Sequence, residues 1–198
     1  MTDYFKTLGI DRTFGVDRER LETYFHELQA GSHPDRHVNA TFERRELALT
    51  ESSDINAAYR TLREPLSRTK HLLALYGFFV GEQKQVSPAL LMTVMEAQEK
   101  ITNLEAVSDP QTKQRYMHEL GAIAEELEMK RIALDEERGR IAKEWDVQMH
   151  SVESSELKPM ERELLGRMTQ LLAERAYLET LHWSVQAAQQ GKPAFIQH

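Results

Sequence analysis

The tripeptide His33-Pro34-Asp35, followed directly by Arg36, is the most distinctive set of polar residues in the sequence. Pro34 restricts the backbone, Asp35 offers a carboxylate that can pair with an arginine, and His33 adds a rigid polar edge. Taken alone, such a tripeptide is better explained by a plain turn, because proline ends helices and aspartate bonds to nearby backbone amides. The segments on either side therefore decide between a turn and a docking site.

The residue patterns do not indicate catalysis by the chain itself. The eight histidines are scattered, and His33 and His37 share a short predicted loop rather than one helix face, so this pair does not predict a metal site. The sequence contains no Gly-rich phosphate loop, nucleophile elbow or paired-carboxylate motif. The acidic stretch 125–137 also contains Lys130 and Arg131, which is typical of a solvated helix face. We expect no catalytic residue, no metal and no cofactor.

The residues around the tripeptide predict an antiparallel hairpin of two amphipathic helices. Asp17 can cap the first helix, which we expect to end near Gly31. Its apolar residues recur at intervals of three and four: Leu21, Tyr24, Phe25 and Leu28. The second helix is expected from about Thr41 to Leu62. Its inward-facing residues are predicted to be Leu47, Ile55, Ala58, Tyr59 and Leu62. The hairpin tip, 32–39, then carries the tripeptide.

Two short helices are expected beside this hairpin. The segment 3–8 predicts a helix that Gly9 stops, because glycine tolerates the left-handed conformation at a helix end. Pro65 suits the first turn of another helix, where its missing N–H has no cost, and this helix should end before Gly77.

Three further helices are predicted beyond 77–87. Their expected start signals are Ser87-Pro88, Ser108-Asp109-Pro110, and Ser154 or Ser155 before Pro159. The first carries apolar residues at intervals of four and three: Leu90, Val94, Ala97, Ile101 and Leu104. Similar repeats in the other two helices, joined by short connections, predict a three-helix bundle. The expected fold is all-α, with domains at 1–76 and 88–190, a linker at 77–87 and a tail at 191–198.

With these elements in place, the N-terminal segment resembles a J domain, and more narrowly the HscB family of iron–sulfur co-chaperones. The resemblance runs through DYFKTLGI at 3–10, HPDRH at 33–37, and INAAYRTLREPLSRTKHLL at 55–73. The last stretch separates HscB-like sequences from generic J domains, which usually lack its Leu-Arg-x-Pro continuation into a leucine-rich helix. From Gly77 onward the resemblance is one of architecture and of a few positions.

The resemblance implies a co-chaperone that docks on a DnaK-class chaperone ATPase, HscA in this family, and stimulates its ATP hydrolysis. It also implies delivery of the scaffold protein IscU, in support of iron–sulfur cluster assembly and transfer. The chaperone-binding residues that it implies are His33, Pro34, Asp35 and Arg36.

This chain departs from the J-domain pattern at several positions. J domains generally carry several basic residues along the helix before the tripeptide, whereas here Arg18 and Arg20 lie at its start. Steering of the partner is therefore expected to rest on Arg36, Arg44 and Arg45. Ser32 stands where an aromatic residue is usual, and His71 where the family often has tyrosine.

A second predicted site lies on the helix that begins at Pro88, on the side away from its apolar seam. A rotation of 100° per residue carries apolar residues to that side, where they either pack on a neighbouring part of the chain or bind a client. The resemblance agrees with a client site, because five residues match scaffold-binding positions of the family: Leu91, Met92, Met95, Glu96 and Glu99. It also implies an apolar contact from the last helix, at Gln170 or Leu171.

Composition limits the partner classes. The formal net charge of −7 argues against nucleic acid as the principal ligand. The chain has no cysteine, so any iron–sulfur role must be exercised through partners. Its start lacks a basic and apolar leader, and no run approaches the roughly 18 apolar residues of a membrane span. We expect a cytoplasmic protein without membrane contact. A J protein for a different client, or a helical adaptor with a degenerate J domain, stays an alternative.

Overall fold

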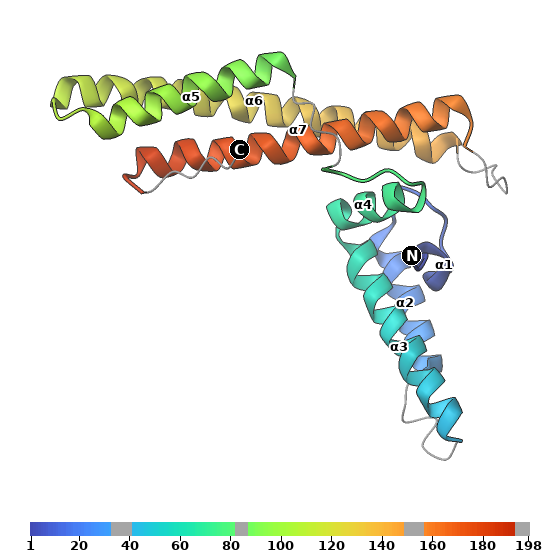
Figure 1. Cartoon of the computed structure of the whole chain (residues 1–198). Helices are drawn as coiled ribbons and strands as arrows, with labels where there is room; N and C mark the ends of the chain where they lie inside the picture. The colour runs from blue at the N-terminus through green and yellow to red at the C-terminus, as the bar shows by residue number, and fades with distance from the viewer. Residues whose placement is uncertain (33–40, 82–86, 149–156, 193–198) are drawn as a thin grey trace. The chain divides into compact units, whose positions relative to one another are not determined.

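The computed structural model describes residues 1–32, 41–81, 87–148 and 157–192, and its elements within these ranges are all helices. The predicted all-α class is confirmed (Figure 1). The helices are α1 Tyr4–Leu8, α2 Arg18–Ser32, α3 Phe42–Arg63, α4 Pro65–Leu75, α5 Pro88–Ala106, α6 Pro110–Gln148 and α7 Pro159–Gln189. No helix in the described ranges is long and apolar enough to cross a membrane.

The chain divides into two compact units. The first consists of Met1–Phe79 with Ile141–Leu165, and the second of Val80–Arg140 with Gly166–His198. The end of α6 and the start of α7 thus belong with the N-terminal helices. The sequence predicted that 88–190 form one domain. This division into compact units does not test that prediction.

Side-chain caps fix the helix starts in the first unit. Asp3 begins α1 by accepting bonds from the N–H groups of Phe5 and Lys6, at 3.1 and 3.2 Å. Gly9 ends that helix with a φ of 66°, the left-handed region that glycine enters without strain. Asp17 accepts the N–H groups of the first turn of α2, as predicted. These caps place the hairpin helices with bounds within two residues of those expected.

The inward face of α3 differs from the prediction at one position. Leu47 is 53% exposed, whereas Ala48 beside it is fully buried. Ala48 lies seven residues before Ile55 and therefore on the same helix face, while Leu47 is turned about 100° away. The larger apolar side chain was expected inside, but the period of the helix selects the smaller one.

The segment between α1 and α2 is held by the end of α6, within the first unit. Trp145 is fully buried, and its indole N–H donates to the carbonyl of Arg12 at 3.0 Å. The carboxylate of Asp146 accepts the N–H groups of Phe14 and Gly15, each at 2.7 Å. A Cβ on Gly15 would lie 2.9 Å from the Asp146 carboxylate, so a larger residue at this position would push the carboxylate out of its place. We call these contacts the Trp145–Asp146 clasp.

The core of the second unit is formed by α5, α6 and α7. The predicted seam of α5 is confirmed, because all five of its residues are at most 6% exposed. They pack with apolar residues from the other two helices: Leu120, Ile123, Leu127, Leu178, Leu181, Val185 and Ala188.

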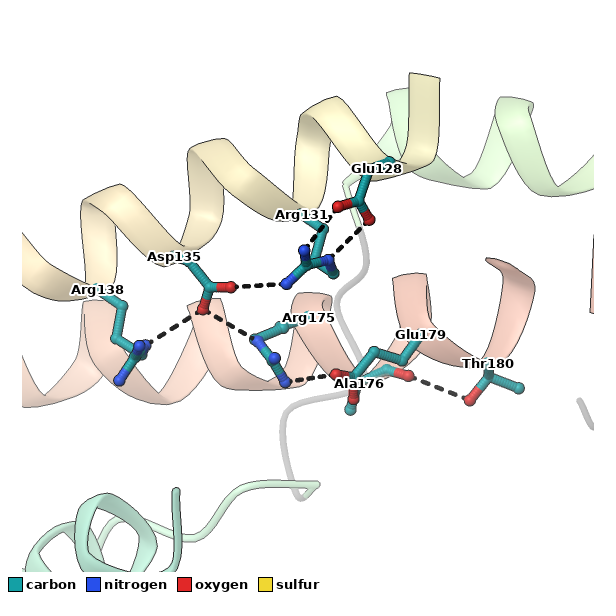
Figure 2. A network of polar contacts seen from close by, with 8 residues as sticks. All are labelled: Glu128, Arg131, Asp135, Arg138, Arg175, Ala176, Glu179 and Thr180. Atoms are coloured by element: carbon teal, nitrogen blue, oxygen red, sulfur yellow. Dashed lines mark hydrogen bonds and ion pairs between the residues drawn. The ribbon is translucent and has the colours of Figure 1, made fainter. Parts of the chain in front are cut away.

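Charged side chains also join α6 to α7 (Figure 2). Asp135 of α6 pairs with Arg175 of α7 at 3.1 Å and with Arg131 at 3.0 Å. Arg131 in turn donates two hydrogen bonds to Glu128. This bidentate pair lowers the pKa of Glu128.

Candidate functional site

The two helices on either side of the predicted chaperone-binding tip are described. α2 ends at Ser32, which is buried and whose hydroxyl donates to the carbonyl of Leu28 at 3.0 Å. Thr41 caps α3 by accepting the N–H of Arg44 at 3.3 Å. His33, Pro34, Asp35 and Arg36 lie outside the described residues, and so does His37. Their role in chaperone binding stays a prediction.

Exposed basic side chains lie at the first turn of α2, which is the end of the hairpin away from the tip, and at the first turn of α3, next to the tip. Arg18 pairs with Glu22 at 3.3 Å, one turn along α2. Arg20 donates to the hydroxyl of Tyr24 at 3.1 Å, and this bond raises the pKa of Arg20. On α3, Arg44 lies 3.8 Å from Glu51, and Arg45 is exposed. The first turn of α3 therefore carries Arg44 and Arg45, two of the three residues expected to steer the partner, whereas Arg18 and Arg20 lie at the far end of the hairpin.

The outer face of α5, defined as Leu91, Met92, Met95, Glu96 and Glu99, points to solvent. Met92 is 73% exposed, Met95 69% and Leu91 46%. These are large exposures for apolar side chains within a helix whose seam is buried. The structure thus brings the five predicted scaffold-binding residues onto one side of α5, away from the core of the second unit. Exposed methionines adapt to irregular partner surfaces, since the side chain is flexible and polarisable.

Acidic and basic groups border this face. Lys100 lies 2.7 Å from Glu119 of α6 and 3.6 Å from Glu96. The hydrogen bond to Glu119 raises the pKa of Lys100 and lowers that of Glu119. Within the described chain, Glu99 has no ion-pair partner. A partner with a basic rim and an apolar centre fits this arrangement best.

The structure separates the two alternatives on the last helix. Leu171 is 5% exposed and belongs to the core, as its place in the apolar repeat suggested. Gln170 is exposed and donates to Glu174 at 3.5 Å. Gln170 is therefore the one of the two that a partner can reach. Its polar amide does not supply the apolar contact that the resemblance implied.

No group of three or more metal-ligating side chains is found in the part of the chain that the structure describes. The Trp145–Asp146 clasp is the main feature that sequence reasoning missed. Its partners are separated by more than 130 residues along the chain. A tryptophan and an aspartate at the end of a long helix gave no local signal.

The sequence matches curated co-chaperones named HscB. One, from Proteus mirabilis, is 33% identical over 109 residues, which cover 54% of this chain and 63% of that protein. An HscB homolog from Vibrio cholerae is 34% identical over 111 residues, covering 55% of this chain and 65% of the relative. These matches make the chain similar to HscB co-chaperones along the matched stretch. The matched stretch spans just under two thirds of these relatives' length. No family model matches the sequence.

The solved structure of the human co-chaperone HscB shares the fold of this chain. The human co-chaperone HscB superposes with a TM-score of 0.58 at 21% identity, covering 94% of this chain and 81% of the human chain. Chaperone HscB from Vibrio cholerae aligns over 96% of this chain and 99% of its own, at 24% identity and a TM-score of 0.49. The likeness to the human structure is one of fold.

Proposed function

We propose that the chain is a J-domain co-chaperone that binds an IscU-type scaffold and delivers it to an HscA-type chaperone of the DnaK class. In this proposal it stimulates the ATPase of that chaperone in support of iron–sulfur cluster assembly and transfer, and catalyses no reaction itself. Its expected cytoplasmic location belongs to the same proposal. The similarity to HscB co-chaperones supports the class of protein.

The proposal that the chain binds a scaffold rests on one observation, the exposure of the outer face of α5. Met92 and Met95 are 73% and 69% exposed on a helix whose other side is core. Burying such side chains against a partner is favourable, at about 25 cal/mol per Å² of apolar surface. The exposed Glu96 and Glu99 beside them would pair with basic residues of the scaffold, which gives orientation as well as affinity.

A titration of an IscU-type scaffold tests this half directly. The double variant Met92→Ala, Met95→Ala should weaken binding by at least about tenfold, because centrally placed apolar anchors carry most interface energy. The double variant Met117→Ala, Met129→Ala is the matched control, since it removes two exposed methionines from α6. Equal affinity of the α5 variant and the wild type would refute the assigned face.

The chaperone half rests on the hairpin of α2 and α3 and on the tripeptide at its tip. Single-turnover ATP hydrolysis by an HscA-type chaperone should accelerate with the wild type and not with Asp35→Ala. Asp54→Ala removes an exposed carboxylate from α3 and should keep full stimulation. Equal stimulation by Asp35→Ala would contradict the assigned docking site and favour an adaptor with a degenerate J domain.

A further inference from the structure

A hollow of about 570 Å³ opens in the first unit, where the start of α2 meets the end of α3 and the start of α4. This is the end of the hairpin away from the turn that joins α2 to α3. Its volume lies in the range of small-molecule sites, roughly 300–1,000 Å³. The lining residues are Val16, Arg18, Leu21, Tyr59, Arg60, Arg63, Glu64, Pro65 and Arg68.

The floor of the hollow is formed by two buried residues, one of them hydrogen-bonded to the backbone. Leu21 is 1% exposed and Arg68 is 8% exposed. The guanidinium of Arg68 donates to the carbonyl of Phe14 at 2.8 Å and to the carbonyl of Leu62 at 2.5 Å. It therefore contributes a fixed positive charge beneath the hollow while its main task is to tie three segments together.

The rim carries three exposed arginines: Arg18, Arg60 and Arg63. Two of them are held in place by one aromatic network. The guanidinium of Arg63 lies 5.8 Å from the ring centroid of Tyr59, which is stacked on Phe25 at 4.1 Å. Glu22 accepts from the Tyr59 hydroxyl at 3.4 Å and from Arg18 at 3.3 Å. Side chains held in this way lose less conformational entropy when they bind a ligand.

The charge of the hollow is positive within an acidic protein. Four guanidiniums line it, whereas Glu64 supplies the negative charge among the same residues. Across the described ranges, Arg60 and Arg63 have no carboxylate within ion-pair distance. Two arginines that line one hollow without a matched acid, as Arg60 and Arg63 do in the described ranges, are typical of an oxyanion site. A phosphate suits several guanidiniums better than a carboxylate, because it offers three oxygens and more than one charge.

We propose that this hollow binds a phosphate group, carried either by inorganic phosphate or pyrophosphate or by a small phosphate monoester. Arg60 and Arg63 are its principal ligands, and Arg18 closes one side of the rim. This site uses neither the hairpin tip nor the outer face of α5, so it does not depend on the proposed co-chaperone function.

Calorimetric titration of the full chain at constant ionic strength tests the site, with inorganic phosphate, pyrophosphate and glycerol 3-phosphate as separate probes. We expect at least one probe to bind with a dissociation constant of about 1 mM or tighter. The double variant Arg60→Gln, Arg63→Gln should weaken it at least about tenfold, since two charge-assisted contacts are removed. The order of the three affinities distinguishes free phosphate from a monoester.

Arg115→Gln is the matched control. Arg115 also lies over a tyrosine ring, at 5.3 Å from Tyr116, but in the second unit. The variant Arg115→Gln should leave the affinity for the phosphate probes unchanged. Arg63 also contacts Tyr59, so its replacement could weaken binding by disturbing the fold. The variant Arg63→Lys separates the two effects. Its melting curve should match that of the wild type, and it should still bind the phosphate probe more weakly. Binding of none of the probes, or equal loss in Arg115→Gln, would overturn the site. Tighter binding of poly-glutamate than of any phosphate would do the same.

Discussion

His71 is a buried titratable side chain in the first unit. It is 8% exposed, its ring stacks on Tyr4 with centroids 4.5 Å apart, and its Nε2 accepts the N–H of Tyr4 at 3.2 Å. An accepting Nε2 requires the neutral ring with its hydrogen on Nδ1. Burial lowers the pKa of His71 below 6.5, and the nearby Asp3, which raises it, does not reverse this. The bond that ties α1 to α4 therefore depends on a deprotonated histidine.

Stability should consequently fall in mild acid. The unfolded chain takes up a proton at an ordinary histidine pKa of about 6.5, while the folded chain resists it, so the stabilisation is complete above that pH. It is lost as the pH falls through the lower pKa of the folded state. Urea unfolding between pH 8 and pH 5 should show a smaller loss for His71→Gln than for the wild type. The exposed His26→Gln is the control and should follow the wild type. If the unfolding free energy of His71→Gln fell with pH as steeply as that of the wild type, His71 would not be the source of the acid sensitivity.

Among the elements, the end of α6 sets the conformation of the segment before α2. Replacing Asp146 by alanine leaves the N–H groups of Phe14 and Gly15 without their acceptor. The bond to Phe14 is partly buried and the bond to Gly15 is exposed, so each contributes the net value of an ordinary hydrogen bond, about 0.5–1.5 kcal/mol, and the two together about 1–3 kcal/mol of unfolding free energy. We expect a loss of this size for Asp146→Ala in urea unfolding. Asp11→Ala, an exposed aspartate in the same loop, should change the stability little.

A double-mutant cycle tests the close approach of Gly15 to the same carboxylate. Gly15→Ala should destabilise the wild type, because its Cβ would stand 2.9 Å from the Asp146 carboxylate. In the Asp146→Ala background this clash is absent, so the same substitution should cost clearly less. Additive effects of the two substitutions would contradict the clasp as described.

The ion pairs between α6 and α7 stabilise the second unit to a modest degree. Asp135 pairs with Arg131, Arg138 and Arg175, and its side chain is 28% exposed (Figure 2). Asp135→Asn should lower the unfolding free energy by about 1 kcal/mol at low salt, and by less at high salt because ions screen partly exposed pairs. Glu136→Gln, at the neighbouring exposed position, should have little effect. A salt-independent loss in Asp135→Asn would point to packing instead.

The sequence predicted what local rules determine. Asp17, Ser87 and Asp109 cap helices where the sequence placed the helix starts. The seam of α5 followed from its spacing. The side chains at the hairpin tip stay predictions, because 33–36 lie outside the described residues.

Features that depend on distant segments could not be read from the sequence. The Trp145–Asp146 clasp joins residues more than 130 positions apart. The arginine hollow needs α2, α3 and α4 at once. Leu47 was wrongly predicted to face inward because it is a larger apolar residue than the neighbouring Ala48. The helical spacing from Ile55 instead places Ala48 inward. The features that the sequence did not predict thus depend on contacts between distant segments, or on which of two adjacent residues faces the core.

At the scale of the whole molecule, the two surfaces to which we assign different tasks in the proposed function belong to different compact units. The hairpin that leads to His33, Pro34 and Asp35 belongs to the first unit, and the outer face of α5 belongs to the second. Because the two sets of residues share no side chain, a substitution in one set should abolish one activity and leave the other intact. Asp35→Ala should therefore bind an IscU-type scaffold as tightly as the wild type does, in the same titration. A weakened affinity would mean that the tip takes part in client binding.

The central claim is that one chain couples a scaffold to a chaperone ATPase, and scaffold-dependent stimulation of ATP hydrolysis tests it most directly. Single-turnover hydrolysis by an HscA-type chaperone is measured with and without an IscU-type scaffold, for wild type, Asp35→Ala and Met92→Ala, Met95→Ala. The wild type should stimulate hydrolysis, and more strongly when the scaffold is present. Asp35→Ala should give neither effect, and the methionine variant should give only the scaffold-independent one. Full scaffold-dependent stimulation by either variant, or none by the wild type, would contradict the account.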